Sequence, residues 1–255
     1  MVEIKTRAEI AAMREAGRVV GQALEATRKV AAIGVSLKEL DEVAHTILRE
    51  AGATSPFLGY QPSFAPVPFP GVICASVNDA VVHGIPTDYR LRDGDLVSID
   101  CGATLRGWTG DAAITFTVGT PRPKDLTLIA DTRRALEAGI AAAVPGGRLS
   151  DISAAIGAVA RGAGYGMPRD WGGHGIGRTM HEDPHVQNEG RPGRGMALRP
   201  GLTLALEPML LAGGKDACYT ARDGWTFHTS DGSRAAHIEH TIAITEDGPQ
   251  ILTLP

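Results

Sequence analysis

The feature that most limits the fold of this chain of 255 residues is an internal repeat with an offset of 112 residues. The letters ALEA at 23–26 return at 135–138. Across the thirty positions that follow from residue 23, ten are identical to their counterparts without a gap. A chance match between two alanine-rich helices is the alternative. Recurrence at a fixed offset indicates instead that one supersecondary unit is duplicated.

The repeated unit reads as a pair of helices. Thr6 and Ser36 are each followed three residues later by glutamate, the capping-box signature of a helix start. Apolar residues at helical spacing follow both signatures, and a glycine closes each run. The sequence therefore predicts helices from residue 6 to about 32 and from 36 to about 51, and a second pair 112 residues later.

Segments with strand character follow each helix pair. They are 72–82 and 95–118 after the first pair, and 201–211, 236–245 and 250–254 after the second. Strands joined by hairpins pair antiparallel, and helices grouped in this order cover one face of the sheet. We therefore expect an α+β fold in one domain, 1–255, with halves of about 1–120 and 121–255. The proline-rich stretch 61–70 is expected to be a surface loop.

Composition excludes several classes of protein. The net charge of −4 gives no general attraction to phosphate backbones or anionic lipid, so we expect no direct nucleic-acid partner. No stretch approaches 18 apolar residues, which argues against a membrane span. Three widely spaced cysteines fit reduced thiols better than a disulfide framework. We expect a soluble, cytoplasmic protein.

The stretch HEDPH at 181–185 matches the letters of a zinc-protease helix, H-E-x-x-H. That pattern needs both histidines on one face of an α-helix. Pro184 lies between them, and a helix through a proline costs about 3 kcal/mol or more. Four glycines between 172 and 177 also favour irregular or extended backbone. We therefore predict no zinc helix here.

Four carboxylates and one histidine form the strongest chemical pattern. Asp100 and Asp111 flank a hairpin, and alone each would fit ordinary turn chemistry. Glu207 and Glu239 lie inside apolar strand segments, where an acidic residue is disfavoured unless it is compensated. With His174, the set offers four oxygen ligands and one imidazole. This mixture suits Mn²⁺, Fe²⁺, Co²⁺ or Zn²⁺, and has enough carboxylates to bridge two ions.

These motifs resemble a known family. VVHGIP, SIDCG with GDAAITF, GGHGIGRTMHEDP, LALEPM and HIEHT are similar, in order and spacing, to the type I methionine aminopeptidases of the pita-bread metallopeptidase family. The resemblance spans nearly the whole chain. It implies the pita-bread fold, in which pseudo-twofold duplicated helix pairs pack on a curved antiparallel sheet.

The resemblance also implies roles for single residues. Two divalent ions per chain would be held by Asp100, Asp111, His174, Glu207 and Glu239, with Asp111 and Glu239 bridging them. The implied catalytic residues are His83, His181 and Glu207. The implied substrate-binding residues are His83, His181, Tyr60, Phe57, Cys74, Met180 and Trp225. Glu182 and His185 receive no role.

The implied function is a metalloaminopeptidase that removes the N-terminal methionine of nascent polypeptides when the second residue is small. The two metal ions, Co, Mn, Fe or Zn, would activate the attacking water. The implied enzyme is a monomer that meets nascent N-termini, with transient proximity to the ribosome. The alternatives are a proline-specific aminopeptidase or prolidase of the same fold, or an inactive binding protein. Prolidases usually carry an extra N-terminal domain, whereas the first helix pair here begins at residue 6.

Some positions depart from the family pattern. The stretch 61–70 lengthens the segment between two expected pocket residues. Phe57 and Met180 stand where close relatives often carry Cys and Phe. Four further histidines have no motif support, and we expect them to be solvated or structural: His45, His228, His237 and His240.

Overall fold

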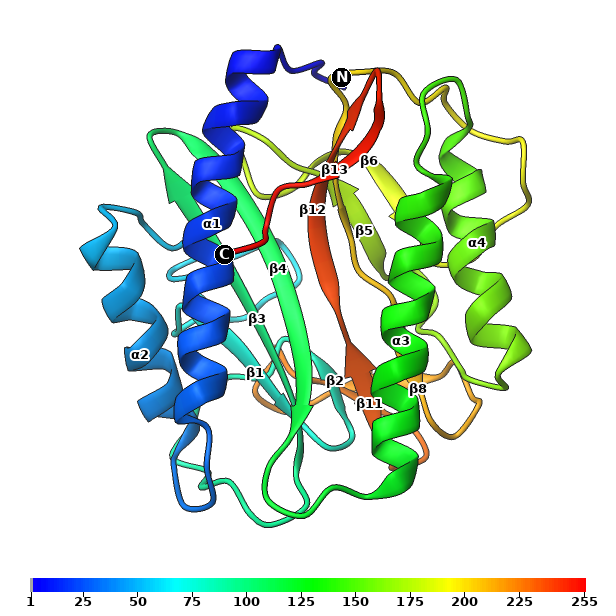
Figure 1. Cartoon of the computed structure of the whole chain (residues 1–255). Helices are drawn as coiled ribbons and strands as arrows, with labels where there is room; N and C mark the ends of the chain where they lie inside the picture. Colours follow the sequence, from blue (N-terminus) through cyan, green and yellow to red (C-terminus); the bar gives the residue numbers. More distant parts are fainter. Residues whose placement is uncertain (1) are drawn as a thin grey trace.

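The computed structural model describes residues 2–255 and contains two helix pairs, which lie next to each other over the two halves of a central sheet (Figure 1). The first pair is α1 (Arg7–Val30) and α2 (Leu37–Glu50), and the second is α3 (Pro123–Ala142) and α4 (Leu149–Gly162). The offset of 112 residues carries both ends of α2 onto both ends of α4, and the last residue of α1 onto the last residue of α3. The sequence repeat therefore coincides with a repeated pair of helices in the structure.

The helix ends follow from local chemistry. The Glu9 amide donates to the Thr6 hydroxyl and the Glu9 carboxylate accepts from the Thr6 amide, so the predicted capping box is present. Ser36 starts α2 in the same way. Gly34 and its counterpart Gly146 have φ of 90° and 86°, a conformation that glycine adopts without strain. The same turn therefore leads into the second helix of each pair.

The strands lie mostly where the sequence predicts them. The predicted segments give β1 (Ile73–Val77), β2 (Ala80–Val82), β3 (Leu96–Leu105), β4 (Trp108–Thr117), β7 (Thr203–Leu206), β8 (Met209–Leu211), β11 (Ala235–His237), β12 (Glu239–Thr245) and β13 (Gly248–Ile251). Four short strands were not predicted: β5 (Gly172–Gly175), β6 (Glu182–Gln187), β9 (Cys218–Thr220) and β10 (Phe227–Thr229). The stretch 61–70 contains no helix or strand, as expected for a loop.

The main sheet runs in the order β1-β3-β4-β12-β7-β5-β6, with β13 paired to β12. Its pairings are antiparallel, which confirms the α+β class. β2, β10 and β9 form a smaller sheet, and β8 pairs with β11. Strands β4 and β12 meet at the centre, so they join the half that carries α1 and α2 to the half that carries α3 and α4.

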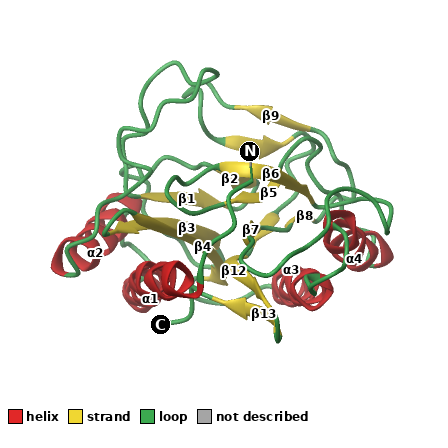
Figure 2. Ribbon diagram, turned by 90° about the horizontal axis from the view of Figure 1, so that it is seen from above, coloured by secondary structure: helices red, strands yellow, loops and turns green. Residues whose placement is uncertain are grey.

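All of the helices among the described residues lie on one side of the curved main sheet, and β2 and β9 lie on the other (Figure 2). Each helix pair has its own apolar core. α1 and α2 pack on β1, β3 and β4 through residues such as Leu40 and Ile99, and α3 and α4 pack on β7 and β12 through residues such as Ile156 and Ile242. Both cores lie between helices and sheet, so the opposite face of the sheet is free to carry a polar site.

Within residues 2–255, no helix is long and apolar enough to cross a membrane.

Candidate metal centre

Three acidic residues lie on one face of the sheet because of strand register. Asp100 in β3 and Glu239 in β12 both lie opposite Ala113 of β4. Asp100, Ala113 and Glu239 therefore form a row across three neighbouring strands. Asp111 precedes Ala113 by two positions, and side chains two apart in a strand point to the same face. The predicted hairpin therefore brings both aspartates to one face, and β12 adds Glu239.

His174 and Glu207 reach the same place from the other half of the chain. His174 in β5 pairs with Ala205 of β7, and Glu207 comes directly after β7. The His174 Nε2 atom lies 3.7 Å from the Glu207 Oε1 atom. The His174 Nδ1 atom lies 2.9 Å from the Gly175 carbonyl oxygen, which needs a proton on Nδ1. The Nε2 lone pair of His174 is then available to a metal.

The carboxylates are too crowded to stay ionised alone. Burial, and then repulsion from Asp111, raises the pKa of Asp100 well above its ordinary value. Burial and repulsion from Glu239 raise the pKa of Asp111, and burial and repulsion from Glu207 raise that of Glu239. One buried oxygen on each of Asp100, Asp111 and Glu239 has no hydrogen-bond partner among residues 2–255. A bound polycation would offset the repulsion between the carboxylates and would also give their unpaired oxygens a partner.

The donor atoms fall into two groups that share one residue. Asp111, His174 and Glu239 offer atoms within 4.8 Å of one another, and so do Asp100, His237 and Glu239. Oxygen and imidazole donors suit divalent transition metals. The residues therefore fit a metal centre, and the shared Glu239 fits a ligand that bridges two ions.

His237 is a member of this cluster that the sequence analysis missed. Its Nε2 atom lies 3.5 Å from Glu207 Oε2 and 3.4 Å from Glu239 Oε2, and only 2% of its side chain is exposed. Burial opposes ionisation of Glu207, but the nearby imidazoles of His237 and His174 outweigh it and hold the pKa of Glu207 below its ordinary value. His237 is thus not merely a solvated or core residue. Its position two residues before Glu239 was the available signal.

The other histidines without motif support are placed as expected. The His240 Nδ1 atom lies 2.8 Å from the Thr253 hydroxyl, and the His228 Nδ1 atom lies 3.1 Å from an Asp79 carboxylate oxygen. Neither lines the cavity described next.

A cavity of about 310 Å³ opens from the acidic cluster, and every predicted site residue lines it. The expected metal ligands are Asp100, Asp111, His174, Glu207 and Glu239; the expected substrate residues are Phe57, Tyr60, Cys74, His83, Met180, His181 and Trp225. They come from both halves of the chain. The fold therefore assembles in one place residues that the sequence spreads from 57 to 239.

His83 and His181 lie on the walls of the cavity as neutral imidazoles. Burial lowers the pKa of each to about 4. The His181 ring lies 4.4 Å from the His174 ring, and its Nδ1 atom lies 3.2 Å from the Tyr60 hydroxyl. The His83 ring contacts Trp171 edge-on at 4.9 Å between centroids. Both imidazoles can therefore donate one hydrogen bond into the cavity at neutral pH.

The remaining wall is apolar and includes residues that the sequence analysis did not name. Phe57, Cys74, Met180 and Trp225 form one cluster with Phe69. Phe64, in the predicted loop 61–70, contacts the rings of Trp171 and Trp225 edge-on and also lines the cavity. The Trp225 Nε1 group donates to the Val67 carbonyl at 2.9 Å. The loop 61–70 therefore forms part of the pocket, which its proline-rich composition did not indicate.

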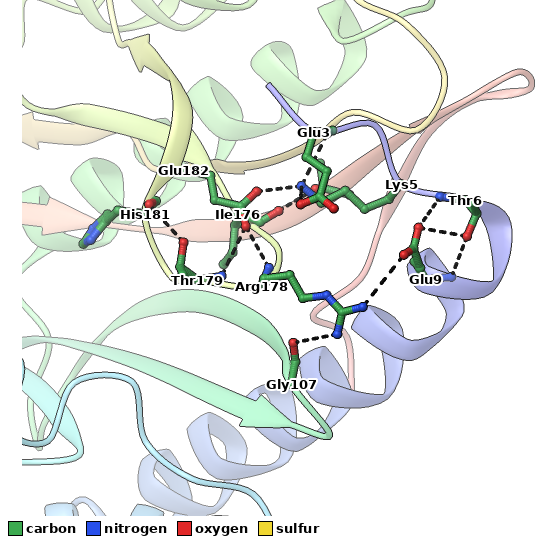
Figure 3. Close-up of polar contacts among 11 residues, drawn as sticks. Glu3, Lys5, Thr6, Glu9, Gly107, Ile176, Arg178, Thr179, His181 and Glu182 are labelled. Atoms are coloured by element: carbon green, nitrogen blue, oxygen red, sulfur yellow. Dashed lines mark hydrogen bonds and ion pairs between the residues drawn. The ribbon is translucent and has the colours of Figure 1, made fainter. Parts of the chain in front are cut away.

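The HEDPH stretch is extended, as Pro184 predicted. Glu182–Gln187 is strand β6, and His185 lies opposite His174 of β5. Glu182 and His185 have surroundings that the sequence analysis did not anticipate. His185 lines the cavity, and Glu182 forms an ion pair of 2.6 Å with Lys5 (Figure 3).

Comparisons with known proteins agree with this site. A model of the metallopeptidase family M24 matches residues 11–246. The chain therefore belongs to metallopeptidase family M24, a class of metal-dependent peptidases.

Similar proteins of known name indicate which kind of metallopeptidase this chain resembles within family M24. A methionine aminopeptidase 1 from Mycobacterium tuberculosis is 52% identical, over 100% of this chain and 96% of the relative. A methionine aminopeptidase 1 from Bacillus subtilis is 44% identical, over 99% of each chain. The crystal structure of the methionine aminopeptidase of Thermotoga maritima matches with a TM-score of 0.95 and 41% identity, over 100% of both chains. The resemblance to type I methionine aminopeptidases is thus confirmed.

A more distant structure confirms the fold. The prolidase of Pyrococcus furiosus matches with a TM-score of 0.79 and 24% identity, over 99% of this chain and 65% of that chain. The pita-bread fold is therefore confirmed, and the stronger likeness lies with the methionine aminopeptidases rather than with the prolidase.

Proposed function

We propose that this protein removes the N-terminal methionine of nascent polypeptides when the second residue is small. The observation that carries this proposal is the arrangement of the cavity, in which an acidic and imidazole cluster adjoins a wall of aromatic and sulfur side chains. Aromatic rings and soft sulfur atoms suit a methionine side chain, and the cavity is of the size of a small-ligand pocket. The likeness to methionine aminopeptidases over the full chain supports the same assignment.

The proposed cofactor is a pair of divalent ions, Co, Mn, Fe or Zn, held by Asp100, Asp111, His174, Glu207 and Glu239. When bound, such ions polarise the carbonyl of the scissile bond and lower the pKa of a water molecule. Asp111 and Glu239 are the proposed bridging ligands. The raised pKa values of the carboxyl groups and their unpaired oxygens support this, because a polycation relieves both.

The chain itself supplies the proton transfers and the orientation of the peptide. We assign to Glu207 the transfer of a proton from the attacking water to the departing amine, since the nearby imidazoles of His237 and His174 favour its ionised form. His181 donates a hydrogen bond to the carbonyl oxygen as negative charge develops there. If the Tyr60 hydroxyl donates to Nδ1 of His181, the Nε2 proton is the one left for this task. His83 stabilises the intermediate or the departing nitrogen.

The methionine side chain is assigned to the pocket of Tyr60, Phe57, Cys74, Met180 and Trp225, with Phe64 and Phe69 as additional walls. Five of these side chains pack into one cluster, so the pocket has a fixed shape before substrate enters. A fixed apolar pocket discriminates by size and loses little entropy on binding.

The ligands come from both sides of residue 120, which supports one catalytic domain of 1–255 with halves of about 1–120 and 121–255. The substrates are nascent polypeptide N-termini. We place the protein in the cytoplasm as a monomer that comes transiently close to the ribosome, without direct contact with nucleic acid or membrane.

The experiment that tests this function is a comparison of peptides. The purified protein is incubated with Met-Ala-Ser, Met-Trp-Ser and Leu-Pro-Ser in the presence of Co²⁺, Mn²⁺ or Fe²⁺. We expect cleavage of Met-Ala-Ser alone to be rapid. Preference for cleavage before proline, whatever the first residue, would show that the protein is a proline-specific aminopeptidase.

A further inference from the structure

The loop between β5 and β6 carries Met180 and His181 to the cavity, and one carboxylate holds it. The Glu182 Oε1 atom accepts hydrogen bonds from the Arg178 amide at 2.7 Å and from the Thr179 amide at 3.2 Å (Figure 3). The Thr179 hydroxyl in turn donates to the His181 carbonyl at 3.2 Å. Glu182 therefore fixes the backbone on both sides of Met180.

The other oxygen of Glu182 is held by Lys5, a residue from the segment before α1. The Lys5 Nζ atom lies 2.6 Å from Glu182 Oε2. The Lys5 side chain is only 2% exposed and that of Glu182 15%. A lysine is rarely so buried unless it is paired. The Lys5 amide also donates to the Gly201 carbonyl at 2.8 Å, so the N-terminal segment is fixed at its backbone as well.

The chain leaves room for this ion pair at Gly177. A Cβ atom there would lie 2.5 Å from Lys5 Cε, 2.7 Å from Lys5 Nζ and 2.9 Å from Glu182 Oε1. These distances are shorter than real Cβ contacts, so a larger residue would displace the pair. Lysine, glutamate and glycine thus form one close-fitting unit.

This unit lies behind His181. Neither Lys5 nor Glu182 is among the described residues that line the cavity. In Figure 3 the Glu182 side chain points toward Lys5, and the His181 ring points to the opposite side. His181 directly precedes Glu182 and its carbonyl accepts from Thr179, so anchoring Glu182 and the loop amides also restrains the backbone that carries His181. A small displacement of a group that acts on the transition state costs a large part of the rate.

We propose that the Lys5–Glu182 ion pair is the positioning element of His181, so that the segment before α1 is part of the catalytic apparatus. Neither residue touches the substrate. The ion pair holds the imidazole where it meets the carbonyl oxygen, and this inference rests on the role of His181 in the proposed function.

The test is a double-mutant cycle on full-length, metal-loaded protein with Met-Ala-Ser as substrate. The single variants are Lys5→Met, which keeps side-chain length but removes the charge, and Glu182→Gln, which keeps the acceptor for the loop amides. Each is also combined with His181→Ala. Lys38→Met is the matched control, because it removes an ion pair of 2.8 Å with Asp88 at the exposed surface. Metal content and thermal unfolding are measured for each variant.

We expect Lys5→Met and Glu182→Gln each to lower kcat by about 10- to 100-fold while KM and metal content stay within about twofold. In the His181→Ala background the same changes should alter kcat by less than about twofold, because the group that they position is gone. Lys38→Met should retain full kcat.

The proposal is overturned if both variants keep the wild-type kcat, or if they lower kcat by the same factor with and without His181. Loss of the fold in both variants would also overturn it, because the Lys5–Glu182 ion pair would then stabilise the whole protein rather than position the His181 imidazole. The wild-type rate on Met-Ala-Ser, measured in the same series, tests the proposed function separately. If the wild type cleaves another N-terminal residue, the ratios are measured on that peptide.

Discussion

His181 and His185 are four residues apart in the sequence but have different neighbours. The His181 ring lies between Tyr60 and His174, whereas His185 lines the cavity but belongs to neither group of metal-donor atoms. We predict that His181→Ala retains metal and loses on the order of 10²-fold in kcat, the scale of one positioned transition-state donor. His185→Ala should keep metal and most activity.

Measurement of kcat and elemental analysis of bound metal check both variants, with Glu207→Ala as the comparison. Glu207→Ala should lose activity and at least part of the metal, because it removes a ligand and the proposed proton carrier together. A metal-free, inactive His185→Ala beside a normal Glu207→Ala would mean that HEDPH binds the metal, and the assignment would be wrong.

A residue of the candidate site could be predicted where its polarity conflicts with the apolar residues next to it in the sequence. Glu207 and Glu239 attract attention because each carboxylate stands within an apolar stretch of the sequence, and burial indeed raises the pKa of Glu239. His237 shows no such conflict, since a histidine fits a strand end. Its neighbours Glu207 and Glu239 come together only when β11 and β12 are in place. Phe64 was missed for a similar reason, because its aromatic partners Trp171 and Trp225 are distant in the sequence.

At the scale of elements, the helices could be predicted because their ends carry their own signals. Thr6 and Ser36 form the capping boxes that the sequence indicates, and the repeat then locates α3 and α4. Strands β5 and β6 could not be predicted in this way. Their glycines and proline disfavour regular strands, and they pair because β7 and the neighbouring loop hold them in place.

The loop 61–70 shows how an element without regular structure contributes to the site. Its prolines give no helix or strand, but the Gln61 side-chain amide donates to the Ala65 carbonyl at 3.3 Å and the Val67 carbonyl accepts from the Trp225 indole. These contacts place Phe64 and Phe69 against the cavity. The loop thus shapes the pocket by fixed backbone geometry rather than by secondary structure.

At the scale of the whole molecule, duplication explains why the carboxylates are crowded. The hairpin of β3 and β4 comes from one half and β7 and β12 come from the other, so their acidic residues meet at the join. Without metal this crowding opposes folding. Because burial raises the folded-state pKa of Asp100, Asp111 and Glu239, their contribution to stability is full below the unfolded pKa values near pH 4 and is lost as pH rises through the folded values.

We therefore predict that Glu239→Gln stabilises the metal-free protein at pH 8 and weakens its stabilisation by metal. Thermal unfolding of both proteins at pH 5 and pH 8, with and without Co²⁺, measures this. The metal-free variant should unfold a few degrees above the metal-free wild type at pH 8, since about 1 kcal/mol corresponds to about 2–4 °C in a protein of this size. The difference should shrink at pH 5. Equal stability of the metal-free proteins at both pH values would show that the ionised Glu239 carboxylate does not destabilise the metal-free fold.

The measurement that tests the metal-dependent aminopeptidase most directly is hydrolysis of Met-Ala-Ser by protein from which metal has been removed, with the bound metal determined by elemental analysis. We predict no cleavage by the metal-free protein, and recovery as Co²⁺, Mn²⁺ or Fe²⁺ is added back. Full activity after verified removal of metal would contradict the account.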